Sequence, residues 1–590
     1  MEELSLLHPA SGTAKYRDLP EETVHDLALE EICASLTPKD TERKLIFRIM
    51  SKIPCEAATV QYRCDVFEDI LNYPLLRERM MKLLDRVDFL RTYGSFGKDS
   101  DAAGIWELVH RLDEIDEYIQ CVEAMYECLN ENEIHSEGLL EIKKYVKRLY
   151  EDHGFESLKK DIEGLKLDTS RIRSVTLGVN LNDRFEPNGV GIVSINSKSF
   201  TKSGILSNFC DFLNRGDEIQ EGTQWKENYT YRMARSDALA SAGGKMERVA
   251  AVGAARNFAA APGIVNTLAD GRSEDVMRSL DRVVTSMLTS TVKKLKHTLS
   301  EHITVSTQVI TGLIPEFMYY IRWAEYVEGL EKLGFTMCKP QLLEDGCRDM
   351  HACGIYNLRL AAASWNQYLT ETGQEAETVR KGPKMNRADF IVKNDLDFDR
   401  EHRLYILTGA NRGGKTTITQ AVGIAFLLAQ GGIYVPSDSF QFSPADCIFT
   451  HFPADENKTM DLGRLGEESK RFKEIFQAAG SDSLILLNES FSTTSFEEGF
   501  YIARDAIRAM QRLDVRMIYN THMHKLAEEI DVLNEDSKDG GRFASLVAET
   551  EDGKRSYRVR IAPPRGLSYA RDIAEKYGVT YEQLMEGKRN

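Results

Sequence analysis

At 590 residues the chain exceeds the length that one hydrophobic core organises, so several domains are expected. Hydrophobic residues make up 42%, as in ordinary globular proteins, and no apolar run reaches the ~18 residues that a membrane span requires. The formal net charge of −17 argues against non-specific coating of nucleic acid, although it permits a local basic surface. Ten scattered cysteines and the lack of a signal-peptide pattern predict a reduced, cytoplasmic protein with no membrane partner.

Helical spacing of apolar residues dominates two regions of the first half of the chain. One run extends from Leu139 to Leu165, with an interruption near Gly154. A second run begins at Leu280 in a pattern close to a heptad and reaches about Leu333, with Pro315 as the expected kink. These patterns predict two long helices.

A β-containing segment is predicted between these helices. Val175, Leu177, Val179 and Leu181 alternate with other residues, which indicates a strand with one buried face. The sequence PNG at 187–189 predicts a turn, and GIVSIN at 191–196 predicts the returning strand. Six basic residues follow this segment: Lys198, Lys202, Arg215, Lys226, Arg232 and Arg235. They could contact nucleic-acid phosphates, or they could form an ordinary solvated surface. For any single one of them, the solvated surface is the commoner role.

The sequence TGANRGGKTTITQ at 408–420 contains the phosphate-binding pattern G-x-x-x-x-G-K-[ST]. The apolar run at 404–407 predicts a buried strand before it, and the apolar stripe at 418–430 predicts a helix after it. Backbone N–H groups of such a loop and of the helix N-terminus bind phosphate. We expect Lys415 to reach the β and γ phosphates of ATP and Thr416 to bind Mg²⁺. The expected nucleotide-binding residues are Gly409, Ala410, Asn411, Arg412, Gly413, Gly414, Lys415, Thr416 and Thr417.

Two further apolar runs end in polar residues that suit ATP hydrolysis. SLILLNESF at 483–491 predicts a strand followed by Glu489, which would orient the attacking water as a catalytic residue. Asn488 stands where an Asp would usually support Mg²⁺. VRMIYNTH at 515–522 predicts another strand, after which His522 would contact the γ-phosphate. The alternative for His522 is an ordinary loop or core histidine.

The order of these segments resembles the ATPase domain of the MutS family of DNA mismatch-repair proteins. Further segments support the similarity: FIVKNDLDF (390–398), GIYVP (432–436), the region 447–476, NESFSTTSFEEG (488–499), NTHMHKL (520–526) and GLSYARDIAEKYGV (566–579). Residues 59–87 resemble the family's helical core. The resemblance covers the C-terminal half most specifically and extends upstream more weakly.

The resemblance implies a multidomain fold: a helical core at 1–135, and lever helices at 136–335 with a small clamp-like β insertion at about 172–270. A C-terminal α/β P-loop domain of the ABC type follows at 336–590, ending in a dimerisation segment at about 560–590. Phe390 would stack on adenine. Because ATP sites of the family are shared across a dimer, Ser469 would contact the nucleotide of the second subunit. The alternative role of Ser469 is the N-cap of the helix that follows it, and the two roles are compatible.

Four departures from the family qualify this interpretation. Core-like sequence begins within the first ~60 residues, so no N-terminal mismatch-recognition domain is expected. The chain stops soon after the ATPase, so no Smr domain is expected either. Asn488 replaces an Asp, which predicts weaker Mg²⁺ support and slow hydrolysis, and Ser492, Thr493 and Thr494 replace a Gly-Thr-Ser sequence.

The function implied is a homodimeric ATPase that couples ATP hydrolysis to the clamping of duplex or branched DNA, in mismatch repair or recombination. The alternative is an ABC-type mechanochemical ATPase that acts on a non-DNA partner, such as a nucleoprotein or ribosomal particle. ATP and Mg²⁺ are the expected cofactors.

Cys338, Cys347, His351 and Cys353 lie near one another in the sequence, but their spacing does not fit the usual zinc patterns.

Overall fold

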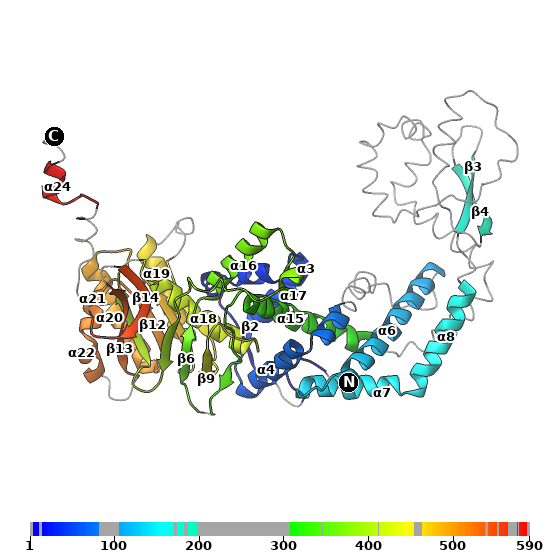
Figure 1. Cartoon of the computed structure of the whole chain (residues 1–590), viewed down its shortest axis with the longest axis horizontal. Helices are drawn as coiled ribbons and strands as arrows, with labels where there is room; N and C mark the ends of the chain where they lie inside the picture. The colour runs from blue at the N-terminus through cyan, green and yellow to red at the C-terminus, as the bar shows by residue number, and fades with distance from the viewer. Residues whose placement is uncertain are drawn as a thin grey trace, which may run out of the picture. The chain divides into compact units, whose positions relative to one another are not determined.

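The computed structural model describes residues 4–10, 14–81, 105–169, 174–181, 187–196, 307–344, 346–410, 412–453, 463–536, 541–551, 554–564, 575 and 577–586. These residues form a mixed structure of helices and sheets (Figure 1). The chain divides into two compact units. The first comprises Met1–Leu84, Glu127–Tyr145 and Val309–Asn590, and the second comprises Asp85–Tyr126 and Val146–Gln308.

A six-stranded sheet lies at the centre of the first unit, in the strand order β10-β11-β12-β8-β13-β14. Its strands are β8 (Leu404–Gly409), β10 (Ile448–His451), β11 (Leu484–Asn488), β12 (Arg516–Asn520), β13 (Phe543–Glu551) and β14 (Lys554–Ile561). Neighbouring strands from β10 through β13 are parallel, and β14 pairs antiparallel with β13. The strands predicted at 404–407, 483–488 and 515–520 are therefore confirmed, as β8, β11 and β12.

Helices cover both faces of this sheet, which explains why its central strands are almost continuously apolar. On one face α18 (Lys415–Gln430) packs against β8, β11 and β12, which confirms the helix predicted after the phosphate-binding pattern. On the other face a hydrophobic core joins the sheet to α19 (Gly463–Ala478), α20 (Phe496–Leu513), α21 (His524–Glu528) and α22 (Ile530–Asp536). Alternate strand residues such as Ile485 and Leu487 point into this core.

A four-stranded sheet in the order β5-β9-β6-β7 lies in the same unit. Its strands are β5 (Gln341–Leu342), β6 (Met350–Ile355), β7 (Asn394–Phe398) and β9 (Ser439–Phe442). Helices α16 (Leu358–Thr372) and α17 (Ala376–Lys381) connect β6 to β7. The side chain of Asn357 caps α16 by accepting a hydrogen bond from the backbone N–H of Arg359 at 2.9 Å.

The N-terminal residues pack onto the part of the first unit that contains the six-stranded sheet. Their elements are β1 (Tyr16–Asp18), α1 (Glu21–Asp26), α2 (Leu29–Leu36), α3 (Asp40–Met50), β2 (Lys52–Pro54) and α4 (Ala57–Asn72). Helix α18 contacts both α4 and β2, and the buried Gln430 side chain donates to the carbonyl of Pro54 at 2.8 Å. No sequence pattern predicted these contacts, because they join residues almost 400 positions apart.

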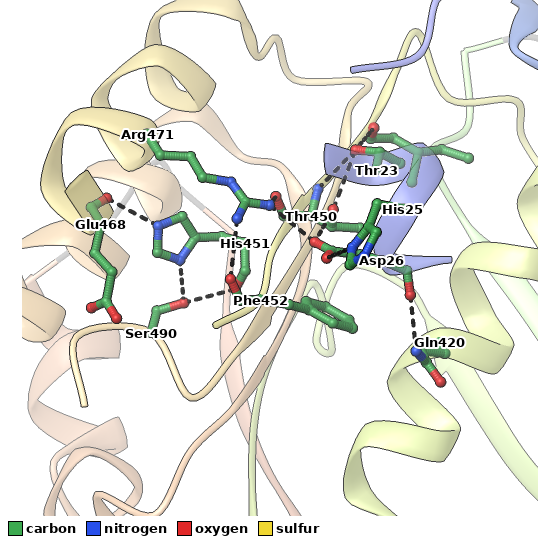
Figure 2. A network of polar contacts seen from close by, with 11 residues as sticks. Thr23, His25, Asp26, Gln420, Thr450, His451, Phe452, Glu468, Arg471 and Ser490 are labelled. Carbon is green, nitrogen blue, oxygen red and sulfur yellow. Dashed lines mark hydrogen bonds and ion pairs between the residues drawn. The ribbon is translucent and has the colours of Figure 1, made fainter. Parts of the chain in front are cut away.

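A buried ion pair fastens α1 to this part of the unit (Figure 2). Arg471 of α19 donates to the carboxylate of Asp26 at 2.9 Å and to the carbonyl oxygen of Thr450 at 3.0 Å. The Thr450 hydroxyl donates to the same carboxylate at 2.7 Å, and Gln420 of α18 donates to the carbonyl of Asp26 at 2.9 Å. Helix α1 is thereby connected to α18, β10 and α19.

The remaining elements are α6 (Ile105–Glu131), α7 (Glu137–Tyr150), α8 (His153–Thr169), β3 (Ser174–Leu181), β4 (Pro187–Asn196), α15 (Thr307–Lys332) and α24 (Tyr581–Glu586). The helix predicted over 139–165 is confirmed as α7 and α8, which are interrupted just before Gly154. Helix α15 runs through Pro315, whereas 280–306 lies outside the described residues. Among the described helices, none has both the length and the apolar character needed to cross a membrane.

Strands β3 and β4 form the antiparallel hairpin expected between the long helices. The turn predicted at PNG is wrong, because Pro187 begins β4 and Gly189 pairs with Asn180. A proline is tolerated as the first residue of a strand, where its missing N–H costs little pairing. Residues 197–270 of the expected clamp, including the six basic residues, lie outside the described part of the chain.

Candidate nucleotide-binding site

The predicted site residues converge at one edge of the six-stranded sheet. Because β8, β11 and β12 run parallel, their carboxyl ends place the phosphate-binding loop, Glu489 and His522 together. A cavity of about 790 Å³ opens at this edge. Of the residues predicted from sequence, it is lined by Phe390, Arg412, Gly413, Gly414, Lys415, Thr416, Thr417, Glu489 and His522. Gly409 and Asn488 end β8 and β11, Ala410 follows Gly409, and Asn411 lies outside the described residues.

The loop conformation explains its glycines. Gly409 has a φ of +131°, and a Cβ there would lie 2.8 Å from the carbonyl oxygen of Ala548. Gly414 has a φ of +89° and is the N-cap residue of α18. Side chains at these positions would be strained or would clash, so glycine lets the backbone curve around the helix N-terminus.

Lys415 is buried beneath this loop. Its ammonium group donates to the carbonyl oxygens of Gly409 at 3.0 Å and Ala410 at 3.3 Å. Burial lowers the pKa of Lys415, while the nearby Glu489 carboxylate acts in the opposite direction. Phosphate groups in the cavity would stabilise the charged form of this lysine.

Polar side chains from three elements meet behind the loop. The Thr416 hydroxyl donates to Oδ1 of Asn488 at 2.9 Å, and Nδ2 of Asn520 lies 3.3 Å from the Thr416 hydroxyl oxygen. Nδ2 of Asn520 also donates to Oδ1 of Asn488. Hydroxyl and amide oxygens are ligands that Mg²⁺ accepts. Asn520 was missed in the sequence, where it reads as the end of an apolar strand.

Glu489 follows β11 in a left-handed conformation with a φ of +52°. Its N–H donates to the carbonyl of Asn520 at 2.8 Å, which fixes the backbone against β12. The carboxylate lies 2.8 Å from Nε2 of His522. The hydrogen bond from His522 lowers the pKa of Glu489, so this carboxylate is ionised at neutral pH. An ionised carboxylate at this place is able to accept a hydrogen bond from water.

Two partly exposed aromatic residues line the same cavity. Phe390 is 58% exposed and Tyr557 of β14 is 47% exposed, which leaves ring faces available to a flat group. Tyr557 has a φ of +58°, and Asn394 contacts its backbone carbonyl at 3.3 Å. Tyr557 was missed in the sequence, because the alternation of Tyr557, Val559 and Ile561 indicates only one face of a strand.

Ser469 lies within α19, which begins at Gly463. Its interpretation as a helix N-cap is therefore wrong, since the helix begins at Gly463 and not at Lys470, where its apolar pattern indicated. Ser469 is half-buried and does not line the cavity of its own chain.

A glycine-rich loop between a buried strand and a helix, with an acidic residue and a histidine after neighbouring parallel strands, is the arrangement of a P-loop nucleotide-binding domain. Residues 405–562 match the description MutS domain V, and residues 55–333 match the description MutS2 N-terminal domain. The chain belongs to the MutS family.

Curated relatives match the chain over about a third of its length. The chain is 31% identical over 205 residues to the DNA mismatch repair protein MutS of Chlorobium phaeobacteroides, covering 35% of this chain and 23% of that protein. It is 26% identical over 193 residues to the Endonuclease MutS2 of Thermus thermophilus, covering 33% and 25% of the two chains. The matched region thus spans about a quarter of the length of either relative.

Proposed function

We propose that this protein is an ATPase that works as a dimer and couples ATP hydrolysis to the clamping of DNA. The observation that carries the proposal is the cavity, whose lining brings Lys415, Thr416, Glu489 and His522 together with two partly exposed aromatic residues. Membership of the MutS family supports the same conclusion.

Binding of the nucleotide follows from the lining of the cavity. The loop N–H groups, the N-terminus of α18 and Lys415 suit the phosphates. Phe390 and Tyr557 suit the adenine ring, which needs apolar contacts on its faces. The hydroxyl of Thr416 and the amide oxygen of Asn488 would hold Mg²⁺, which neutralises phosphate charge when it is bound.

Hydrolysis requires an oriented water molecule, and Glu489 is the residue available to hold it. Its ionised carboxylate would accept a proton from the water as the new oxygen–phosphorus bond forms and the bond from the γ-phosphorus to the departing oxygen of ADP breaks. His522 shares a hydrogen bond with this carboxylate, so contact between His522 and the γ-phosphate would change how Glu489 is held. The position of Glu489 would then depend on whether His522 contacts a γ-phosphate.

A dimer would complete the site through Ser469, whose hydroxyl would face the nucleotide of the second subunit. The C-terminal residues support dimerisation because several large apolar side chains there are exposed: Tyr577, Val579, Tyr581 and Leu584. The β3–β4 hairpin would belong to the DNA clamp, and α8 before it and α15 after it in the sequence would be the levers. These roles rest on the family resemblance together with the positions of the elements.

DNA is the favoured partner because the relatives' names describe a mismatch repair protein and an endonuclease. Fluorescence anisotropy of labelled linear, mismatched and four-way-junction DNA tests the proposal, with and without a non-hydrolysable ATP analogue. Ionic strength must be fixed, because phosphate-driven affinity falls steeply with salt.

We expect nucleotide-dependent binding that favours one DNA shape and disappears in Lys415→Ala. Intact nucleotide binding without binding to any of these DNAs would contradict the DNA clamp. That result would favour the non-DNA nucleoprotein partner instead.

A further inference from the structure

The turn that presents Glu489 has an unfavourable backbone conformation. Glu489 has a φ of +52° and Phe491, two residues later, has a φ of +62°. Left-handed conformations are unfavourable for residues with side chains, so such a turn persists only when its surroundings hold it. The contacts of Ser490, which lies between these two residues, identify what holds the turn.

Ser490 is locked to β10 through His451 (Figure 2). The Ser490 hydroxyl lies 2.6 Å from Nδ1 of His451 and 3.0 Å from the carbonyl oxygen of His451. Nε2 of His451 lies 3.0 Å from the carbonyl oxygen of Glu468 on α19. Because a carbonyl only accepts, Nε2 carries the proton and Nδ1 is left as the acceptor of the neutral ring. The Ser490 hydroxyl is therefore the donor within this buried pair.

Glu468 reaches the same turn by a second route. Its carboxylate accepts a hydrogen bond from the N–H of Phe491 at 2.8 Å. The Phe491 ring packs against His451 and Phe472, with centroid distances of 5.7 and 5.5 Å. Tyr519 of β12 completes the enclosure by donating to the carbonyl of Ser490 at 2.7 Å. Both residues that follow Glu489 are thus tied to α19, directly or through His451.

We propose that His451, Glu468 and Ser490 are positioning residues that set the geometry of Glu489 according to the position of α19. The inference rests on the proposed function, because Glu489 is its readout. Ser469 follows Glu468 directly in α19, so a contact between Ser469 and the nucleotide of the second subunit would alter the hold on Glu489 in its own subunit. The two ATP sites of a dimer would be coupled by this route.

Two substitutions of Glu468 provide the first test. Glu468→Ala removes the acceptor for the Phe491 N–H, and we expect kcat to fall by ~10- to 100-fold, because small misplacements of a reacting group are costly. Glu468→Gln keeps an acceptor oxygen and should hold kcat within about threefold of the wild type, by the same argument. The Kd for ATP should stay unchanged in both, since Glu468 does not line the cavity.

Two serine substitutions distinguish an effect on the position of Glu489 from an effect on the stability of the fold. Ser490→Ala removes the hydroxyl that joins the turn to His451 and should lower kcat without changing the Kd for ATP. Ser437→Ala is the matched control: its buried hydroxyl, like that of Ser490, has two acceptors within reach, here the carbonyl oxygens of Cys353 at 2.7 Å and Ser439 at 2.8 Å. The control should lower Tm and leave kcat unchanged.

Wild-type kcat in both Ser490→Ala and Glu468→Ala, with lowered Tm alone, would overturn the inference and assign these residues a structural role. Equal losses in Glu468→Gln and Glu468→Ala would overturn it as well, because the retained acceptor would have made no difference. Failure of the proposed function is distinguishable, since the wild-type protein itself would then neither bind nor hydrolyse ATP.

Discussion

Asn488 is the residue of the site whose chemistry departs most from what Mg²⁺ favours. Its Oδ1 accepts hydrogen bonds from Thr416 and Asn520, so the position is already organised around an acceptor oxygen. A carboxylate binds a hard divalent cation more strongly than an amide does. The amide therefore predicts a protein that needs more Mg²⁺ than a carboxylate variant would.

Asn488→Asp should lower the Mg²⁺ concentration that gives half-maximal ATP hydrolysis and should raise the maximal rate. Both acceptor contacts persist in this variant, because the aspartate oxygens replace Oδ1. Steady-state hydrolysis measured across a Mg²⁺ titration checks the prediction. An unchanged or higher Mg²⁺ requirement would show that Asn488 does not support the ion.

Sequence reasoning at this scale succeeded where a residue belongs to a contiguous motif. Lys415, Thr416, Glu489 and His522 follow strands that are recognisable from their apolar runs, and the parallel sheet brings them to one cavity. Asn520 and Tyr557 escaped prediction because each has an ordinary strand position, and only the packing of neighbouring strands turns it toward the site. Ser469 was misplaced relative to its helix because α19 begins with polar residues that lack an apolar pattern.

Strand β10 contains the buried residue His451, whose titration should make the free energy of unfolding depend on pH. Burial lowers the pKa of His451 from 6.5 to about 4. As the pH falls below 6.5 the unfolded chain binds this proton, whereas the folded chain does not until about pH 4. The free energy of unfolding should therefore decrease over this interval, by up to about 3 kcal/mol for this group.

His451→Asn removes the titrating group and keeps a polar side chain near Ser490. The stability advantage of the wild type over this variant should shrink as the pH is lowered from 6.5 to 4. Denaturant unfolding at a series of pH values measures the difference. A difference that stays constant with pH would mean that His451 does not remain neutral in the folded protein.

Helix α1 should stabilise the part of the first unit that contains the six-stranded sheet, because the ion-paired side chains of Asp26 and Arg471 are only 7% and 19% exposed. Asp26→Ala should lower the free energy of unfolding by about 2–4 kcal/mol, as expected when one partner of a buried ion pair is removed. Asp40→Ala serves as the control, since Asp40 pairs with Lys44 at an exposed position and should leave stability nearly unchanged. Equal effects of the two substitutions would refute this role for α1.

The sequence predicted individual helices and strands better than it predicted how they pack against one another. The hairpin of β3 and β4, the interrupted α7 and α8, and the strand and helix around the phosphate-binding loop follow from periodicity. The packing of the first 80 residues onto α18 does not, because it depends on contacts such as Gln430 with Pro54 that no local pattern encodes. Long-range packing is decided by shape and by buried polar pairs.

The exposed C-terminal side chains lead to a prediction about the whole molecule. Tyr581 is 75% exposed and Leu584 is 53% exposed on α24, and large apolar groups on a surface favour association. Tyr581→Ser combined with Leu584→Ser should shift the protein from dimer towards monomer in sedimentation velocity. Leu75→Ser, at a residue 61% exposed on another part of the chain, is the control. A dimer that persists in the double variant would place the subunit contact elsewhere.

The central claim is that the cavity at Lys415 binds ATP and that Glu489 drives its hydrolysis. ATP binding by calorimetry, combined with the single-turnover hydrolysis rate, should be measured for the wild type and Glu489→Gln. We expect a similar Kd for both proteins and a hydrolysis rate at least ~100-fold lower in the variant, the usual contribution of a positioned proton acceptor. Undiminished hydrolysis in Glu489→Gln, or a wild-type protein that binds no ATP, would contradict it.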